Sequence, residues 1–538
     1  MEEKTCFGVM LDMSRNAVMT VDGVKKYIDN LYKMGYNTLM LYTEDTYEVE
    51  DEPYFGFMRG RYTFEEIKEI DAYAMQKGIE LIPCIQTLAH LQAIFHWPEY
   101  ACKTRDCNDI LLCGEERTYT LIENMFKTIA KTFTSRRVNI GMDEAWMLGF
   151  GEFRMKNGIK THAEIMKQHL AKVVEICNKY GFKPMMWSDM FFRMAIKSGG
   201  YYEKGVKISE EIKAVAPKEV SLVYWDYYNT DKVMYEEMIK SHLQFDNEIW
   251  FAGGAWAWQG FAPFNKFSMK TSKLAMRACK KYGIKNVFIT VWGDNGRECS
   301  PNAILPSLFY AKQVYDGCEN MTEIKAKFKE TIGEDFDAMV GLDMLNEING
   351  FKCKTVNPSK YMFYGDPFFN AFDHTVVGGE GEQYKRQYKR LKKYAKQSAN
   401  FSYIFESEAT LAKALSVKYE LGFNTRKLYQ AGDIDGLKAI IPEYKKAIKY
   451  TEDFYQVFKT LWYKENKPNG FDVIEIRIGG LLLRLKSCKE RLQDYVDGKL
   501  KEIPELNEKL LETYLPWETK GEPLNRNWWS SDITPSIL

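Results

Sequence analysis

The sequence has no long apolar run and no excess of charge of either sign. Its 74 Lys and Arg residues balance its 74 Asp and Glu residues, so no basic face for a nucleic acid is expected. No apolar stretch approaches the roughly 20 residues that cross a membrane, and the acidic start at Glu2-Glu3 is unlike a signal peptide. We therefore expect neither a nucleic-acid partner nor a membrane.

The 11 cysteines show no pattern of a disulfide framework, because their number is odd and their spacing is irregular. Cys102, Cys107 and Cys113 fall close together, but no paired C-x-x-C motif accompanies them, so no zinc site or other metal is expected. This usage is typical of a reduced, cytoplasmic protein.

Aromatic residues are plentiful, at 14% of the chain, and hydrophobic residues reach 45%. That content is enough for full cores, and 538 residues suggest two or three domains. Trp and Tyr also gather at the ends of the predicted strands in the first half. Sugar rings stack their apolar faces on such side chains, so this placement favours a carbohydrate ligand.

Short apolar runs alternate with amphipathic stretches of helical period from Thr5 to about Val314. The predicted strands are residues 6–11, 37–42, 79–85, 138–142, 184–187, 220–224, 249–251 and 287–291. Eight strand–helix units predict an α/β fold, the (β/α)8 TIM barrel, over residues 1–318. A doubly wound sheet is the alternative, but no glycine-rich phosphate loop follows the first strand. The strand pattern then disappears, which predicts an α-helical C-terminal domain over residues 319–538.

Asp143 and Glu144 end the fourth predicted strand, Val138-Asn139-Ile140-Gly141-Met142. Other adjacent acids, such as Glu65-Glu66, lie in helical or loop patterns and are interpreted as solvated charge. Apolar residues flank Asp143-Glu144 instead, and a carboxylic acid in such surroundings can keep its proton near neutral pH and donate it. For both carboxylates to meet one substrate the strand must twist or end there, since consecutive strand residues face opposite ways.

Further motifs follow the predicted strands, each at its own strand end. They are Arg15 after the first strand, His90 after the third, Asp143-Glu144 after the fourth, Trp187 after the fifth, Tyr224-x-Asp226 after the sixth and Trp292-x-Asp294 after the eighth. With these motifs in this order, the barrel region resembles the family 20 glycoside hydrolases, the β-N-acetylhexosaminidases.

The resemblance implies an exo-acting β-N-acetylhexosaminidase that removes terminal GlcNAc or GalNAc from a glycan, needs no cofactor and retains the anomeric configuration. In this family the sugar's own 2-acetamido oxygen attacks the anomeric carbon. Glu144 would be the general acid and base, and Asp143 would accept the acetamido N–H. Tyr224 would donate its hydroxyl to the acetamido carbonyl.

The resemblance also implies a set of substrate-binding residues. Arg15 would bind the 3- and 4-hydroxyls, and Asp226 and Asp294 the 4- and 6-hydroxyls, while His90 would lie near the acids. Either Glu44 or Asp45 would face the site. The sugar walls would be Trp187, Trp292 and one of Trp256 and Trp258, which two-residue spacing puts on one face of an extended segment.

Two departures from the family pattern stand out. Asp294 occupies a position where many relatives carry Glu, which shortens its reach. A helical half follows the barrel, and we expect it to pack on the barrel flank or to form a homodimer.

Two other classes compete with this interpretation. An O-GlcNAc hydrolase or chitinase-like barrel would carry two aspartates or an Asp-x-x-Asp-x-Asp-x-Glu pattern after the fourth strand, and neither is present. A non-catalytic sugar-binding barrel would have lost the acid pair, yet Asp143 and Glu144 are both there.

Overall fold

The computed structural model describes residues 5–348, 355–512, 524 and 528–537. Eight parallel strands close into a barrel in chain order, and β10 pairs with β1. They are β1 (Phe7–Asp12), β2 (Thr38–Tyr42), β3 (Glu80–Cys84), β6 (Arg137–Asn139), β7 (Lys183–Trp187), β8 (Ser221–Trp225), β9 (Ile249–Gly254) and β10 (Asn286–Val291). The TIM barrel and all eight predicted strands are confirmed.

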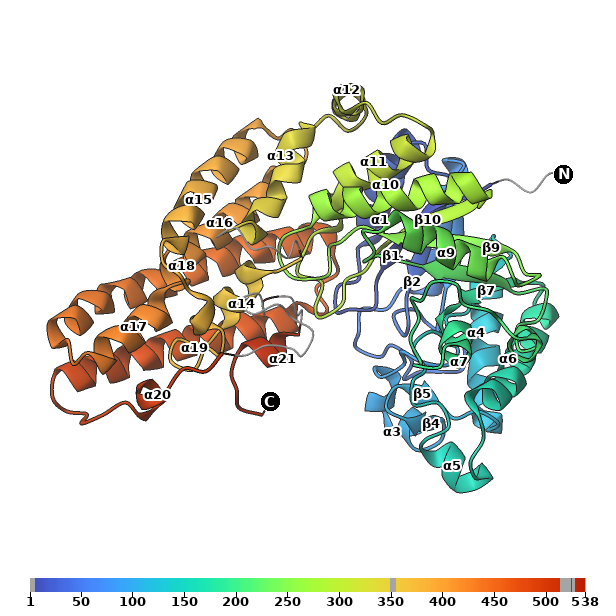
Figure 1. The fold of residues 1–538 in the computed structure, drawn as a ribbon, viewed down its shortest axis with the longest axis horizontal. Helices are drawn as coiled ribbons and strands as arrows, with labels where there is room; N and C mark the ends of the chain where they lie inside the picture. The colour runs from blue at the N-terminus through green and yellow to red at the C-terminus, as the bar shows by residue number, and fades with distance from the viewer. Residues whose placement is uncertain (1–4, 349–354, 513–523, 525–527, 538) are drawn as a thin grey trace.

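A ring of helices covers the outside of the barrel (Figure 1). The longer ones are α1 (Val21–Lys33), α2 (Phe64–Gln76), α4 (Glu116–Thr132), α6 (His162–Lys179), α9 (Lys232–His242), α10 (Asn265–Tyr282) and α11 (Leu305–Tyr315). Capping boxes begin two of them, at Thr63 with Glu66 and at Thr161 with Glu164. Gly78 and Gly181 follow the same two helices with positive φ, which is the usual glycine stop.

Short elements lie in the segments between the strands and the longer helices. They are η1 (Ile94–His96), α3 (Pro98–Ala101), β4 (Arg105–Cys107), β5 (Ile110–Leu111), α5 (Glu152–Asn157), α7 (Asp189–Ala195), α8 (Glu210–Lys213) and η2 (Pro301–Ile304). The antiparallel pair β4–β5 lies in a stretch that the sequence predicts only as a long loop.

After the barrel, every element of the described residues is a helix or helical turn. They are α12 (Met321–Ile332), α13 (Phe336–Val340), η3 (Gly341–Asn346), α14 (Pro358–Tyr364), η4 (Asp373–Thr375), α15 (Glu380–Gln397), α16 (Ser402–Lys418), α17 (Leu421–Gln430), α18 (Ile434–Glu465), α19 (Phe471–Val496), α20 (Pro504–Asn507) and α21 (Trp529–Asp532). The long helices α15, α16, α18 and α19 pack in sequence beside the barrel (Figure 1). The predicted helical domain is confirmed.

The turn between α18 and α19 lies against the barrel's carboxyl-end loops. Met19 and Asn466 form a β-bridge, and the Lys467 Nζ is 2.6 Å from Glu66 Oε2. A Cβ on Gly60 would lie 2.7 Å from the Asn469 Cβ. The helical domain is therefore seated on the same end of the barrel that carries the predicted site.

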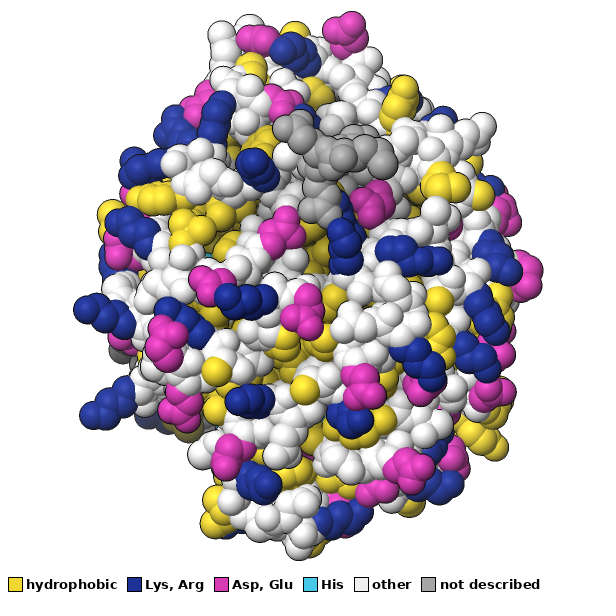
Figure 2. All heavy atoms as spheres, turned by 90° about the vertical axis from the view of Figure 1, so that its right-hand side faces the viewer, with side chains coloured by type: hydrophobic (Ala, Val, Ile, Leu, Met, Phe, Trp, Pro, Cys, Tyr) yellow, Lys and Arg dark blue, Asp and Glu magenta, His cyan; other side chains and the backbone are white. Residues whose placement is uncertain are grey.

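The barrel flank away from the helical domain carries basic and acidic side chains interspersed with one another (Figure 2). Many form pairs, such as Lys281 with Glu236 at 2.6 Å. Within the described part of the chain, no helix has both the length and the apolar character needed to cross a membrane.

Candidate active site

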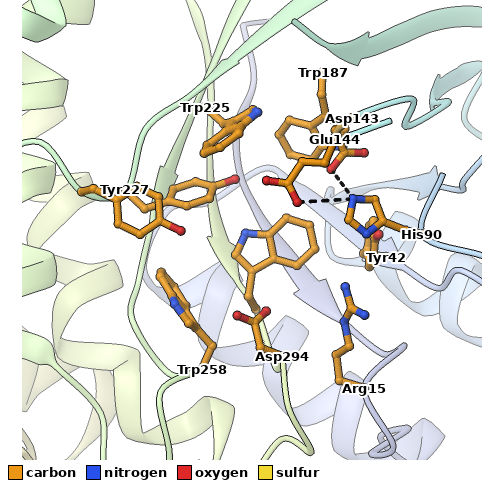
Figure 3. A pocket seen from close by; sticks show the side chains of 12 residues that line it. Arg15, Tyr42, His90, Asp143, Glu144, Trp187, Trp225, Tyr227, Trp258 and Asp294 are labelled. Atoms are coloured by element: carbon orange, nitrogen blue, oxygen red, sulfur yellow. Dashed lines mark ion pairs between the residues drawn. The ribbon is translucent and has the colours of Figure 1, made fainter. Parts of the chain in front are cut away.

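A pocket of about 110 Å³ opens at the carboxyl ends of the strands (Figure 3). Aromatic rings and charged groups share its wall. The lining residues are Arg15, Tyr42, His90, Asp143, Glu144, Trp187, Trp225, Tyr227, Tyr228, Trp258, Trp292 and Asp294. They stand at the carboxyl ends of all eight barrel strands or just after them, so the closed barrel is what brings them together.

The backbone after β6 turns sharply to present both acids. The strand ends at Asn139, and Gly141, Met142 and Glu144 have φ values of 74°, 69° and 53°. Only glycine fits the first of these positions, because a Cβ there would lie 2.0 Å from the Gln86 Oε1. The predicted end of the strand before the acid pair is confirmed.

Asp143 is held as an anion by two donors. The Gln86 Nε2 donates to its Oδ1 at 2.8 Å, and the His90 Nε2 lies 3.1 Å from its Oδ2. Burial raises the pKa of this carboxyl, but the charge and hydrogen bond of His90 outweigh burial and hold the pKa below its ordinary value. Asp143 therefore stays ionised at neutral pH.

Glu144 is in the opposite electrostatic condition. Burial and the neighbouring Asp143 charge raise its pKa to about 7, and the more distant His90, at 3.8 Å, offsets them only in part. Its backbone N–H donates to the Asp189 Oδ2 at 3.1 Å. The Glu144 side chain is 39% exposed, against 11% for Asp143, so the protonated acid faces the pocket opening.

His90 lies beside the two acids, with its Nε2 facing both carboxylates (Figure 3). Burial lowers its pKa, but the Asp143 charge raises it to about 10, so the imidazole is positively charged at neutral pH. The residue has a φ of 57°, and its backbone N–H donates to the Asp109 Oδ2 at 3.1 Å. The predicted position of His90 beside the acid pair is confirmed.

On the next side of the pocket, Arg15 forms an ion pair with Glu44 at 3.1 Å. The Tyr42 hydroxyl donates to the same Glu44 oxygen at 2.9 Å. Asp45 turns away and pairs with Arg59 at 3.2 Å. Of the two acids that the sequence leaves open, Glu44 is therefore the one that faces the site.

Large aromatic rings enclose the pocket. Trp187 and Trp292 lie with ring centroids 6.1 Å apart, and Trp225 stacks on Tyr227 at 5.3 Å. Trp258 completes the wall. Trp256 lies behind it, stacked at 4.6 Å, and donates its indole N–H to the Tyr227 carbonyl. The choice between Trp256 and Trp258 thus falls on Trp258.

The predicted placement of Tyr224 and Asp226 in the pocket is wrong. Tyr224 is fully buried on the helix-facing side of β8, where it stacks on His242 at 4.7 Å. Its hydroxyl donates to Asp226 at 2.8 Å, and Asp226 also accepts two hydrogen bonds from Asn229. The alternation of the strand explains the error, because Val223 and Trp225 are the residues that point inward.

The helical domain contributes to the rim. The Arg477 guanidinium on α19 donates to the Asn295 carbonyl at 2.9 Å and to its side-chain oxygen at 3.0 Å. It also pairs with Glu298 at 3.0 Å, which Lys360 approaches to 2.9 Å. Asp294 lines the pocket next to this clamp, so α19 fixes the loop that carries a site residue.

Two family models match the chain along most of its length. Residues 7–243 match the family 20 glycosyl hydrolase catalytic domain, and residues 334–524 match the Glycoside Hydrolase 20C C-terminal domain. The chain belongs to glycoside hydrolase family 20.

Two β-hexosaminidases are similar to part of this chain. A β-hexosaminidase of Akkermansia muciniphila is 26% identical over 217 residues, which cover 34% of this chain and 44% of that one. A β-hexosaminidase of Porphyromonas gingivalis is 25% identical over 215 residues, covering 34% and 28%. The chain thus spans less than half the length of these relatives. The Vibrio harveyi family 20 exo-β-N-acetylglucosaminidase, solved with N-acetylglucosamine, aligns with a TM-score of 0.48 and 14% identity over 63% of this chain and 58% of that one.

Sequence reasoning missed several residues of this family 20 pocket. Gln86, which orients Asp143, stands four residues before His90, where a site residue was already expected. Trp225, Tyr227 and Tyr228 line the pocket next to the motif that was singled out. The strand alternation of β8, counted from the inward Val223, is the signal that could have found Trp225.

Proposed function

We propose that this chain is an exo-acting β-N-acetylhexosaminidase that cleaves terminal β-linked GlcNAc or GalNAc with retention of configuration. One observation carries the proposal. Two adjacent carboxyls share a pocket, and their surroundings keep Asp143 ionised while raising the pKa of Glu144 to about 7. A fixed anion beside a poised acid is what acetamido-assisted cleavage requires.

In the first step the acetamido oxygen of the terminal sugar attacks the anomeric carbon as the bond to the leaving oxygen breaks. Glu144 gives its proton to that oxygen. Asp143 accepts the acetamido N–H and offsets the positive charge that develops on the bicyclic intermediate. The enzyme itself forms no covalent bond.

In the second step water attacks the anomeric carbon of the intermediate and the ring of the bicycle opens. Glu144, now a carboxylate, takes the proton from that water and returns to its starting state. The Tyr227 side chain lies across the pocket from His90 (Figure 3). Its hydroxyl takes the role that the resemblance implied for Tyr224, that of donor to the acetamido carbonyl.

Arg15, Glu44 and Asp294 would bind the hydroxyls of the terminal sugar. Trp187, Trp258 and Trp292 would enclose its ring and its N-acetyl methyl group. Rings of this kind hold the apolar face of a sugar while the polar groups fix its orientation. The small volume of the pocket supports a single sugar, and therefore exo action.

Comparison of two aryl glycosides tests the proposal directly. The 4-nitrophenyl β-N-acetylglucosaminide should be cleaved, and the matching β-glucoside, which lacks the acetamido group, should not. A thiazoline mimic of the bicyclic intermediate should bind far more tightly than N-acetylglucosamine. Equal turnover of the two glycosides, or equal affinity of the two ligands, would refute acetamido participation.

We also infer a reducing, cytoplasmic setting, which is supported by the ten described cysteines, since no disulfide joins any two of them. A homodimer formed through the helical domain remains a prediction, to be tested by light scattering.

A further inference from the structure

The pocket continues outward into a larger open space. A cavity of about 700 Å³ begins at Glu144 and His90 and reaches Gln92 and Trp528. A second cavity of about 980 Å³ starts from the same Gln92 and Trp528 and extends to Phe57 and Trp97. Because adjacent cavities share lining residues, they form one passage from the acid to the outer surface. We call the outer cavity the distal groove.

The distal groove carries apolar side chains that are unusually open to solvent. Trp528 is 67% exposed, Met58 74% and Phe57 36%. Phe57 meets the half-buried Trp97 edge to face, with centroids 5.3 Å apart, which fixes both rings. Large exposed aromatic surfaces beside a catalytic pocket are typical of ligand-binding surfaces.

Polar groups line the same cavities as these rings. Arg59 is held by Asp45 and lines both cavities. Asp109 lines both as well, and it is the residue whose carboxylate accepts the His90 backbone N–H at 3.1 Å. Asp109, in one wall of the groove, is therefore hydrogen-bonded to His90, the histidine beside the catalytic carboxyls. A surface that combines aromatic rings with hydrogen-bonding groups suits the apolar faces and the hydroxyls of a sugar chain.

Resting on the proposed function, we infer that the distal groove binds the reducing-end part of the substrate, a glycan chain of two or more sugars beyond the bond that is cleaved. Glu144 delivers its proton to the leaving oxygen, and the passage begins at Glu144. The leaving chain therefore starts where the passage starts. The pocket, at about 110 Å³, holds only the terminal sugar, so the length of the substrate must be recognised in the groove.

The test compares substrates of increasing length. For the native protein, kcat/KM on β-1,4-linked N-acetylglucosamine oligomers should rise from the disaccharide to the tetrasaccharide. Trp97→Ala and Trp528→Ala should each lower the ratio of tetrasaccharide to aryl-glycoside kcat/KM by roughly three- to tenfold, the range for one lost aromatic contact. Tyr32→Ala, which removes an exposed aromatic side chain of α1 far from the groove in the sequence, should leave the ratio unchanged.

Binding is measured separately by calorimetry in the Glu144→Gln background, where the tetrasaccharide stays intact. Trp528→Ala should lower the affinity for the tetrasaccharide and leave the affinity for N-acetylglucosamine unchanged. Length-independent kcat/KM, or equal tetrasaccharide affinity with and without Trp528, would overturn the inference. So would a Trp528-dependent dimer in light scattering, since a second copy would then occupy the groove. Failure to cleave the aryl glycoside at all would instead refute the proposed function.

Discussion

The pocket and the distal groove are neighbours built in opposite ways. The pocket's residues stand just after barrel strands and are mostly buried and paired, as His90 with Asp143 at 3.1 Å. The groove's residues stand on loops and on a segment near the C-terminus, and its rings are open to solvent, as Trp528 at 67%. Chemistry needs fixed charges in a dry site, whereas recognition of a variable chain needs only an open surface. The difference predicts that changes in the pocket affect every substrate and changes in the groove only long ones.

Glu144→Gln should have the largest effect. The amide keeps the shape of the side chain but has no proton to give, so kcat on disaccharide and tetrasaccharide should fall by the same factor, about 10² to 10⁴. Binding of N-acetylglucosamine should remain. Steady-state kinetics measures kcat, and calorimetry measures the binding of N-acetylglucosamine.

Glu116→Gln, on an exposed position of α4, is the matched control and should be indistinguishable from the native protein. Near-native turnover in Glu144→Gln would remove Glu144 from the role of acid.

Asp143→Asn should come next, with a fall in kcat of about 10² to 10³ and little change in KM, because the amide cannot offset the charge of the intermediate.

The pH profile provides a second measurement on the same variant. Glu144 must be protonated, so native kcat/KM should decline as pH rises through about 7. The Asp143 charge contributes to that raised pKa, so the decline should move to lower pH in the variant. A decline that stays in place or moves upward would contradict this coupling.

Arg477→Met should have an intermediate effect, since the clamp lies where the pocket meets the passage. In this variant Glu298 loses its ion pair with Arg477 but keeps the one with Lys360 at 2.9 Å. Because one charged partner remains, we expect a loss of only about 1.5–3 kcal/mol in the free energy of unfolding. The loop that carries Asp294 should loosen and raise KM for all substrates, roughly two- to thirtyfold. Denaturant unfolding and kinetics measure the two effects.

Arg484→Met is the control on the same helix. Arg484 pairs with Asp366 at 2.6 Å inside the helical domain, so its loss should lower stability without changing KM. If both variants raised KM alike, α19 would act only through overall stability.

The comparison also explains what the sequence could reveal. Strands followed in order by Arg15, His90 and Asp143 predicted the barrel and most of the pocket, because closure of a parallel barrel places all strand ends together. The prediction for Tyr224 was wrong because a shift of one residue along a strand moves the side chain to the opposite face of the sheet. Neither the contact of Trp528 with the passage nor that of Arg477 with Asn295 could be foreseen, since no local pattern links residues so far apart in sequence.

The smallest effect should come from Phe57→Ala. Phe57 meets Trp97 edge-on at 5.3 Å, so removing it should cost about 0.5 kcal/mol, the low end for an aromatic pair, or roughly a twofold loss in kcat/KM on the tetrasaccharide. The disaccharide should be affected less, because its single leaving sugar ends before the groove. If instead Phe57→Ala slowed both substrates equally, the loop at Phe57 would support the catalytic pocket, and the division between a fixed pocket and an open groove would have to be abandoned.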